Sequence, residues 1–385
     1  MCPIRTKRQL QTLQTIHTSF PVPSLPHQRT WLLRYLAQLY SFSAFFGNLA
    51  VILVIQYSQL RKQPGYVLVT SLAAADLGVS FFVTTFKVDM YVKNGNFCHQ
   101  IELCVFIHLA DTFFPIASIT HLLVICLNRF YAVTRSYSYH IYATYGRQKL
   151  VVAAVWCYAI LWTCLGMFSW DSSPSFYYRI MVYEESRYCT GPNAYYHITL
   201  AIAIFIIPMI ITTVLYSIIL GIATDKASDI PTPVHIYGST SKPKNTNTTK
   251  GVKTIASVFA AYMICWLPNF IVILIQYFAP SVIYEFFMYS PLAYDVVTTV
   301  ISNVLPTVNS AINPFIYFML SDKFKHAFRD NLKKISKRSR YSDGMSQNGM
   351  LLVRRNTLSP SSSSVGIRRP SSVTSYLWHQ EVPML

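Results

Sequence analysis

The chain has 385 residues, of which 52% are hydrophobic and only 12% are charged. Soluble domains carry about 25% charged residues, so this composition excludes most soluble enzymes and disordered proteins. The formal net charge of +17 is concentrated in residues 1–34 and 321–385, and basic tails beside an apolar body favour contact with a membrane surface over nucleic-acid binding.

Seven stretches with almost no charged side chain follow one another along the chain. A membrane-spanning helix needs about 20 mostly apolar residues to cross a hydrocarbon layer about 30 Å thick, and each stretch can supply them. We therefore predict an all-α membrane protein, a bundle of seven transmembrane helices. In chain order the stretches are 35–60, 64–86, 103–128, 150–170, 188–224, 254–284 and 286–321, interrupted only by Asp76, Asp111 and Asp295.

Lysine and arginine residues in the short connections predict the orientation. They dominate the connections after the first, third and fifth stretches, as at Arg61, Arg135 and Lys253, so we expect these connections inside the cell and the N-terminus outside. The predicted organisation is an extracellular segment (1–31), the bundle (32–320), an amphipathic helix on the inner membrane face (321–331) and a disordered cytoplasmic tail (332–385). We expect a multi-pass protein of the plasma membrane.

Four of the eight cysteines fall on the predicted outer side, where disulfides form: Cys2, Cys98, Cys104 and Cys189. We expect a bridge between Cys104, at the top of the third helix, and Cys189, in the long loop before the fifth. Whether Cys98 pairs with Cys2 or stays free is left open.

Asp111 lies within the third stretch and Arg129 directly follows it, and a charge within a membrane is costly enough to suggest a function. Asp111 and Arg129 are 18 residues apart, which is five helical turns and about 27 Å, so they share one face near opposite membrane surfaces. Asp111 follows Cys104 by about two turns, at the depth of an outward-opening pocket. We favour a counter-ion for a ligand, and the alternative is a structural partner for a neighbouring helix.

Prolines interrupt the last three stretches. Pro208, Pro268 and Pro314 each remove a backbone hydrogen bond in mid-helix and permit a kink. Trp266 lies two residues before Pro268, and Tyr317 follows Pro314 by three residues. Any one of these kinks alone would indicate an irregularity in packing. All of them together, in this order, argue against that interpretation.

The landmarks together resemble the rhodopsin-like (class A) family of G-protein-coupled receptors over about residues 32–331. The resemblance implies a receptor, not an enzyme, that binds an extracellular ligand and activates heterotrimeric G proteins when the sixth helix swings outward. It also implies that a receptor kinase and arrestin act on the serine-rich tail. The matching landmarks are Gly47 and Asn48, residues 71–76, residues 128–130, Trp156, Pro208, Tyr216, residues 265–268 and residues 309–317.

The resemblance implies a sodium site in the inactive receptor. One carboxylate with several neutral oxygens suits a hard monovalent cation, and hydrogen bonding without sodium is the alternative. No other cofactor is expected. The implied sodium ligands are Asp76, Ser118, Asn309, Ser310 and Asn313.

The resemblance also implies an activation switch that runs from beneath the ligand to the inner surface. Its members are Asn128, Arg129, Pro208, Tyr216, Tyr262, Trp266, Pro268, Pro314 and Tyr317. The family commonly has an aspartate where Asn128 stands, and an acidic residue near the position of Thr248. Because neither anion is present to hold Arg129, we expect raised basal signalling.

Asp111 occupies the position at which amine receptors pair a carboxylate with the ammonium group of the ligand. An amine is therefore the first expectation, and a peptide with a basic group or another ligand is the alternative. Helix 5 has Leu200, Ala201 and Ile204 where catecholamine receptors place serines, and the seventh stretch lacks the lysine of an opsin. The candidate ligand contacts are Asp111, Thr112, Pro115, Asn269, Phe270, Asn303 and Thr307.

Two other classes are disfavoured. A transporter usually shows inverted repeats, and no internal repeat is visible. An enzyme needs a nucleophile with a base or a metal constellation, and His108, His121 and Cys126 have no such spacing.

Overall fold

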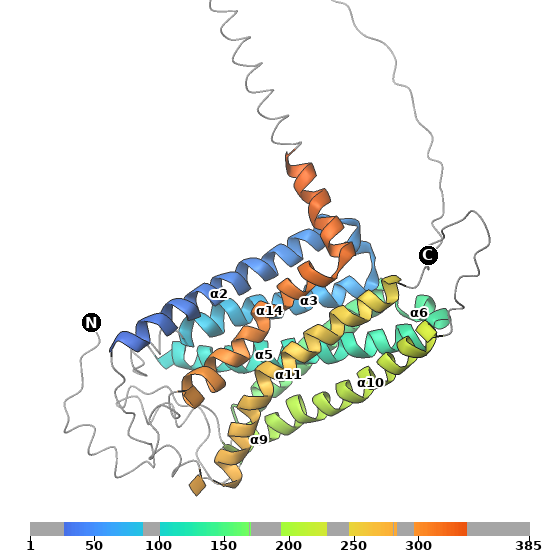
Figure 1. The fold of residues 1–385 in the computed structure, drawn as a ribbon. Helices are drawn as coiled ribbons and strands as arrows, with labels where there is room; N and C mark the ends of the chain where they lie inside the picture. Colours follow the sequence, from blue (N-terminus) through green and yellow to red (C-terminus); the bar gives the residue numbers. More distant parts are fainter. Residues whose placement is uncertain are drawn as a thin grey trace, which may run out of the picture. The chain divides into compact units, whose positions relative to one another are not determined.

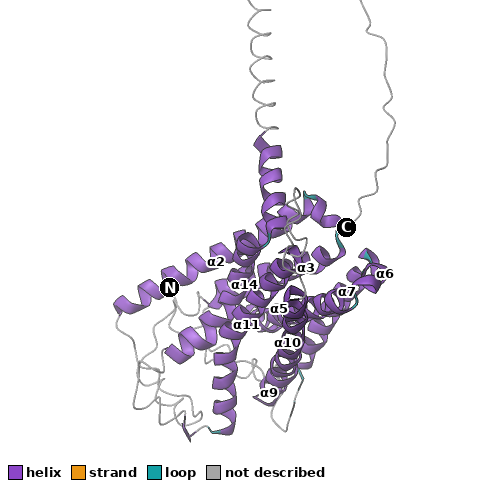
Figure 2. Cartoon of the chain, turned by 45° about the vertical axis from the view of Figure 1, so that its right-hand side comes forward, coloured by secondary structure: helices purple, strands orange, loops and turns teal. Residues whose placement is uncertain are grey.

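The computed structural model describes residues 27–87, 101–168, 170, 194–228, 246–279, 281–282 and 296–336, and within these ranges every regular element is a helix (Figures 1 and 2). The chain separates into two units, Met1–Asn331 and Leu332–Leu385. All interactions described below lie in the first unit.

The first half of the bundle contains four long helices and several short ones (Figure 1). The first is α2 (His27–Gln56), which is followed by the 3₁₀ turn η1 (Gln59–Lys62). Next come α3 (Pro64–Gly78), which continues into the π-helical segment η2 (Val79–Thr84), and α5 (Ile101–Thr134). A short helix, α6 (Ser136–Tyr142), leads to α7 (Tyr145–Leu165).

In the second half, α9 (Ala194–Leu200), the π-helical segment η4 (Ala201–Ile206) and α10 (Ile207–Ser228) follow one another without a break. They precede α11 (Thr246–Phe278). A third π-helical segment, η5 (Val296–Val304), leads into α14 (Leu305–Leu320). Helix α5 contacts α3, α7, α10 and α11, while α2 packs on α3 and α14, so α5 lies at the centre of the bundle.

Six helices of the described residues are long and apolar enough to cross a membrane. The seventh predicted span corresponds to η5 and α14, which adjoin each other and have 9 and 16 residues. The prediction of an all-α, seven-helix bundle is therefore confirmed.

The bundle is apolar on its surface and encloses several polar side chains in its interior. Large apolar side chains such as Phe46, Ile210 and Ile264 are exposed, whereas Asn48 and Asp76 are at most 1% exposed. A protein whose solvent is lipid has this distribution, because unpaired polar groups are costly in hydrocarbon and must find partners within the bundle.

A polar contact between α2 and α14 replaces a backbone hydrogen bond that a proline removes. Pro314 has no N–H, so the carbonyl of Ser310 loses its usual partner four residues on. Asn48 replaces that donor, since its Nδ2 lies 2.9 Å from the Ser310 carbonyl oxygen. The helices approach closely here, because a Cβ on Gly47 would lie 3.1 Å from the Pro314 ring.

The helix that follows α14 covers residues 322–336 and is thus longer than the predicted 321–331. No glycine or proline interrupts residues 332–336, and lysine and isoleucine tolerate a helix. Phe324 is 1% exposed and packs against Phe318, while Asn331 Nδ2 donates to the Val54 carbonyl over 3.2 Å. One side of the helix is therefore anchored to the end of the bundle that we expect to lie inside the cell, here called the inner end.

We expect Asn48→Ala to destabilise the receptor, because it leaves the buried Ser310 carbonyl without a donor. A buried polar group that loses its partner costs about 1–3 kcal/mol. The measurement is the melting temperature of the purified receptor in detergent, which should fall by several degrees. Ser217→Ala is the control, since the exposed Ser217 hydroxyl bonds only within its own helix. Equal melting temperatures for the two variants would contradict this account.

Candidate functional site

The carboxylate of Asp76 connects three helices in the middle of the bundle. Its Oδ1 accepts hydrogen bonds from Ser118 Oγ at 2.7 Å and Ser310 Oγ at 2.8 Å, and its Oδ2 accepts one from Asn313 Nδ2 at 2.7 Å. Asp76 is 0% exposed. No lysine or arginine among the described residues forms an ion pair with it, so hydrogen bonds alone compensate this charge.

The surroundings of Asp76 suit a monovalent cation. Asn309 and Asn313 each have a buried side-chain oxygen with no hydrogen-bond partner in the described part of the chain. Asn309, Ser118 and Ser310 also line a small cavity of about 20 Å³. One carboxylate with hydroxyl and amide oxygens fits sodium better than Ca²⁺, which usually takes several carboxylates.

Nearer the outer end, Asp111 forms an ion pair with Lys87. Lys87 Nζ lies 2.8 Å from Asp111 Oδ1, and the two side chains are 22% and 32% exposed. The second uncharged stretch of the sequence ends at residue 86, whereas the helix includes Lys87. The spacing from Asp76 does not predict the direction of Lys87, because the π-helical segment between the two residues changes the register.

The π-helical segment η2 changes where Lys87 points. A π turn holds one extra residue, so the residues after Thr84 are offset by about one position from a continuous α-helix. The hydroxyl of Thr84 donates to the Val79 carbonyl five residues back, which is the π spacing. Gly78 admits the ring of Phe114 at the start of this segment, where a Cβ would collide with it.

The predicted ligand contacts divide into two groups. Asp111, Pro115 and Thr307 line the 20 Å³ cavity together with Lys87 and Trp266. The Thr307 hydroxyl also lies 3.1 Å from the Tyr40 hydroxyl of α2. These three predicted ligand contacts therefore lie at one site in the bundle.

Three other candidates, Thr112, Asn269 and Phe270, do not line that cavity. Thr112 Oγ1 donates to the His108 carbonyl of its own helix over 2.9 Å. Asn269 and Phe270 are each 9% exposed, and the Phe270 ring stacks on Phe205 with centroids 3.8 Å apart. The side chain of Asn303 lies outside the described residues.

A row of aromatic rings leads from this cavity toward the inner end. Phe270 contacts Trp266 as well as Phe205, and Phe205 contacts Tyr262 with centroids 5.4 Å apart. Phe259 continues the row, with centroids 6.1 Å from Tyr262 and 5.3 Å from Tyr216. Five rings of the row lie on α10 and α11, so a change in how these helices pack would move them together.

Pro208 and Pro268 lie beside this row. The π-helical segment η4 ends two residues before Pro208, and Thr212 Oγ1 donates to the Pro208 carbonyl over 2.6 Å. Pro268 lies inside α11, two residues after Trp266. The indole N–H of Trp266 is buried without a hydrogen-bond partner in the described part of the chain, and the same is true of the Tyr262 hydroxyl.

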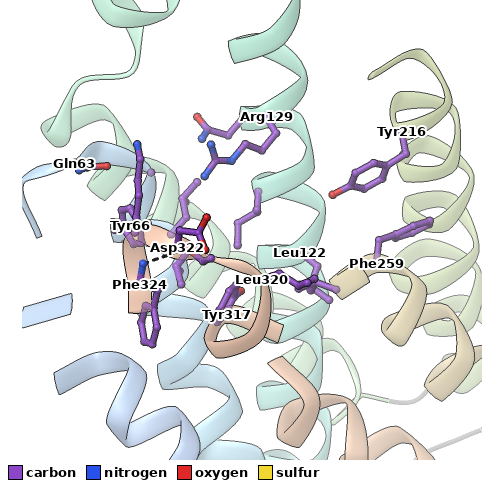
Figure 3. A pocket seen from close by; sticks show the side chains of 18 of the residues that line it. Gln63, Tyr66, Leu122, Arg129, Tyr216, Phe259, Tyr317, Leu320, Asp322 and Phe324 are labelled. Atoms are coloured by element: carbon purple, nitrogen blue, oxygen red, sulfur yellow. Dashed lines mark hydrogen bonds between the residues drawn. The ribbon is translucent and has the colours of Figure 1, made fainter. Parts of the chain in front are cut away.

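The inner end of the bundle contains a cavity of about 220 Å³ (Figure 3). Arg129 of α5, Tyr216 of α10 and Tyr317 of α14 line it from three different helices. The Arg129 Nε and the Tyr216 hydroxyl are buried, and neither forms a hydrogen bond among the described residues. One space is therefore surrounded by these three predicted members of the activation switch, and neither the Arg129 Nε nor the Tyr216 hydroxyl bonds to another of them.

Asn128 is held by a neutral network in place of an ion pair. Its Oδ1 accepts a hydrogen bond from Gln148 Nε2 at 3.2 Å, and its Nδ2 donates to the Tyr139 hydroxyl at 3.3 Å. These bonds connect α5 to α7 and to the short helix α6. Sequence reasoning missed Gln148 and Tyr139, because nothing in their spacing predicts the path of the chain between two helices. Thr248 lies in α11, and its side chain is outside the described residues.

Cys104 is disulfide-bonded. The other described cysteines, Cys126, Cys157, Cys164 and Cys265, are free. The partner of Cys104 therefore lies outside the described residues, as does the predicted partner Cys189.

Comparison with known proteins agrees with this architecture. Residues 47–317, more than half of the chain, match the model of the 7 transmembrane receptor (rhodopsin family). The chain belongs to this family. It is therefore a multi-pass membrane receptor of the kind that acts through heterotrimeric G proteins.

Several curated receptors are similar to the chain. The 5-hydroxytryptamine receptor 1B of Equus caballus is 26% identical over 354 residues, covering 77% of this chain and 85% of that receptor. The trace amine-associated receptor 9 of Rattus norvegicus is 25% identical and covers 74% and 82%. The octopamine receptor beta-1R of Drosophila melanogaster is 25% identical and covers 76% and 60%.

We expect Asn128→Asp to lower ligand-independent signalling, because a carboxylate beside Arg129 can pair with the guanidinium and favour the packing shown here. An interaction of about 1 kcal/mol changes the ratio of two states about fivefold. The measurement is basal G-protein activation in cells at matched surface expression. Asn128→Leu is the control, since it removes the bonds to Gln148 and Tyr139 without adding charge. If the leucine variant lowers the signal as much as the aspartate variant, the charge is not the cause.

Proposed function

We propose that this receptor responds to an extracellular cationic amine whose ammonium group pairs with Asp111. The observation that carries the proposal is the position of this carboxylate, on the central helix α5 and at the wall of the cavity above Trp266. The names of three similar proteins, which are receptors for 5-hydroxytryptamine, trace amines and octopamine, support the same class of ligand.

The path of the signal follows from the packing. Trp266 lines the cavity beneath Asp111 and is the first ring of the aromatic row. The last ring of the row, Tyr216, lines the cavity at the inner end. A ligand that binds one packing of α10 and α11 better than another shifts the population toward it. Outward movement of the inner end of α11 would then enlarge the cavity around Arg129, where a G protein binds. This arrangement has the N-terminus outside the cell.

The tail completes the proposed cycle. Residues 332–385 contain clusters of serine, including the run at 361–364, among basic residues. Phosphorylation by a receptor kinase would replace this neutral polar surface with a cluster of negative charge, which recruits arrestin.

We expect Asp111→Asn to lower the potency of an activating amine by about 100-fold or more, since breaking a buried or partly buried charge pair costs about 3–5 kcal/mol. Second-messenger output from cells expressing the full chain, tested against a panel of biogenic amines, gives the measurement. Glu102→Gln is the matched control, because Glu102 is an exposed carboxylate at the start of the same helix. Silence of the wild type toward every amine, with surface expression confirmed, would redirect the assignment to a basic peptide.

We also propose that Asp76 binds sodium in this packing, with Ser118, Ser310, Asn309 and Asn313 as the neutral oxygen ligands or their supports. Binding to one packing stabilises it: sodium at ten times its dissociation constant contributes about 1.4 kcal/mol. The melting temperature of the purified receptor should therefore rise by about 2–4 °C in sodium chloride relative to N-methyl-D-glucamine chloride at equal ionic strength.

The control for this sodium effect is Asp76→Asn, which keeps an oxygen acceptor and removes the charge. We expect this variant to melt at one temperature in both salts. A wild-type receptor that shows no difference between the salts would leave hydrogen bonding as the whole role of Asp76.

A further inference from the structure

The ion pair between Lys87 and Asp111 connects two membrane-spanning helices at the proposed ligand site. Within the described ranges, the one other ion pair is Lys325–Asp322, three residues apart on the helix at the inner face. Lys87 and Asp111 both line the cavity above Trp266, and both side chains are partly exposed. Asp111 is therefore already paired with a cation before any ligand arrives.

This pairing is unfavourable for a ligand that carries only a positive charge. Such a ligand has to displace the Lys87 ammonium from Asp111, and it then leaves two cations close to one carboxylate. Like charges at such distances repel, and the repulsion is stronger near low-dielectric walls than in water. The pair of side chains is neutral as a unit, so a ligand of zero net charge leaves the charge of the site unchanged.

We propose that the ligand is a zwitterionic small molecule, an α-amino acid, whose ammonium group binds Asp111 and whose carboxylate binds Lys87. This inference rests on the proposed function and extends it by a second charged contact. One side-chain ion pair is exchanged for two ligand ion pairs, so no charge is left without a partner. The long, flexible stem of lysine allows its ammonium to move aside while it remains within reach of the ligand.

The side chain of the ligand is indicated by the apolar groups around the pair. Val79, Val83, Pro115 and Pro306 line the cavity beside the pair. Trp266 forms the wall of the cavity below the pair. A cavity of 20 Å³ admits about one water molecule, so a bulky side chain has to displace its walls. An apolar wall that contains an indole ring favours an aromatic side chain, and displacement of Trp266 would couple binding to the aromatic row.

The test compares aromatic amino acids with the amines that lack only the carboxylate: tryptophan with tryptamine, tyrosine with tyramine and phenylalanine with phenethylamine. G-protein activation is measured as a concentration–response curve in cells expressing the full chain. The wild type should respond to at least one amino acid at a concentration tenfold or more below that of its amine. Asp111→Asn should abolish the response to both.

Lys87→Met is the decisive variant, since it keeps an unbranched side chain only one atom shorter and removes the charge. It should lower the potency of the amino acid by tenfold or more and raise the potency of the matching amine, so that the preference is reversed. Lys87→Arg keeps the charge and should keep the preference of the wild type. Surface staining of each variant separates a loss of response from a loss of folding.

The outcomes separate this inference from the function on which it rests. If amines act through Asp111 while amino acids do nothing, or if Lys87→Met shifts both members of each pair equally, Lys87 does not bind a carboxylate and the inference fails alone. If Asp111→Asn leaves the responses unchanged, the proposed function fails as well. Silence of a surface-expressed wild type toward all three pairs also overturns the inference.

Discussion

The arrangement of this bundle depends on the buried carboxylate of Asp76. Its three hydrogen bonds come from α5 and α14, so one side chain of α3 fixes the distance and rotation of two other helices. Between helices in lipid, apolar contacts give little preference for one partner over another, because lipid tails are equally apolar. Polar groups that must be satisfied internally therefore decide which faces meet, and the apolar side chains can point outward.

Defects in the helical backbone are what put the functional side chains in place. The proline at 314 frees a carbonyl that Asn48 binds, so the contact between α14 and α2 depends on this proline. The π-helical segment η2 offsets the end of the second helix and presents Lys87 to Asp111. In the middle of a regular α-helix every backbone carbonyl has a partner within the helix, so none would be free to bind a neighbouring helix. Without the π-helical segment, Lys87 would also point in another direction.

The sequence predicts the fold well because the signal is a run of uncharged residues, and each helix can be recognised without its neighbours. The depths of Asp111 and Arg129 also follow from spacing alone, since α5 is a continuous helix. Lys87 was missed because its position depends on where the second helix ends and on a π turn, which neighbouring helices determine. The partners of Asn128 were missed for a similar reason: Gln148 and Tyr139 lie beyond a change of chain direction.

Asp111 and Arg129 of α5 have opposite environments, and this asymmetry suits a switch. Asp111 has a cationic partner at the outer end, whereas the Arg129 Nε is buried without a hydrogen bond in the described ranges. Coupling between two sites in a protein is typically worth only about 1–3 kcal/mol, which is close to the value of one hydrogen bond to a charged group. Because the Arg129 Nε has no such bond among the described residues, repacking of α10 and α11 breaks none at this atom. Exchange of the ion-pair partner of Asp111 therefore involves enough free energy to shift the equilibrium between the two packings, provided that Trp266 transmits the change.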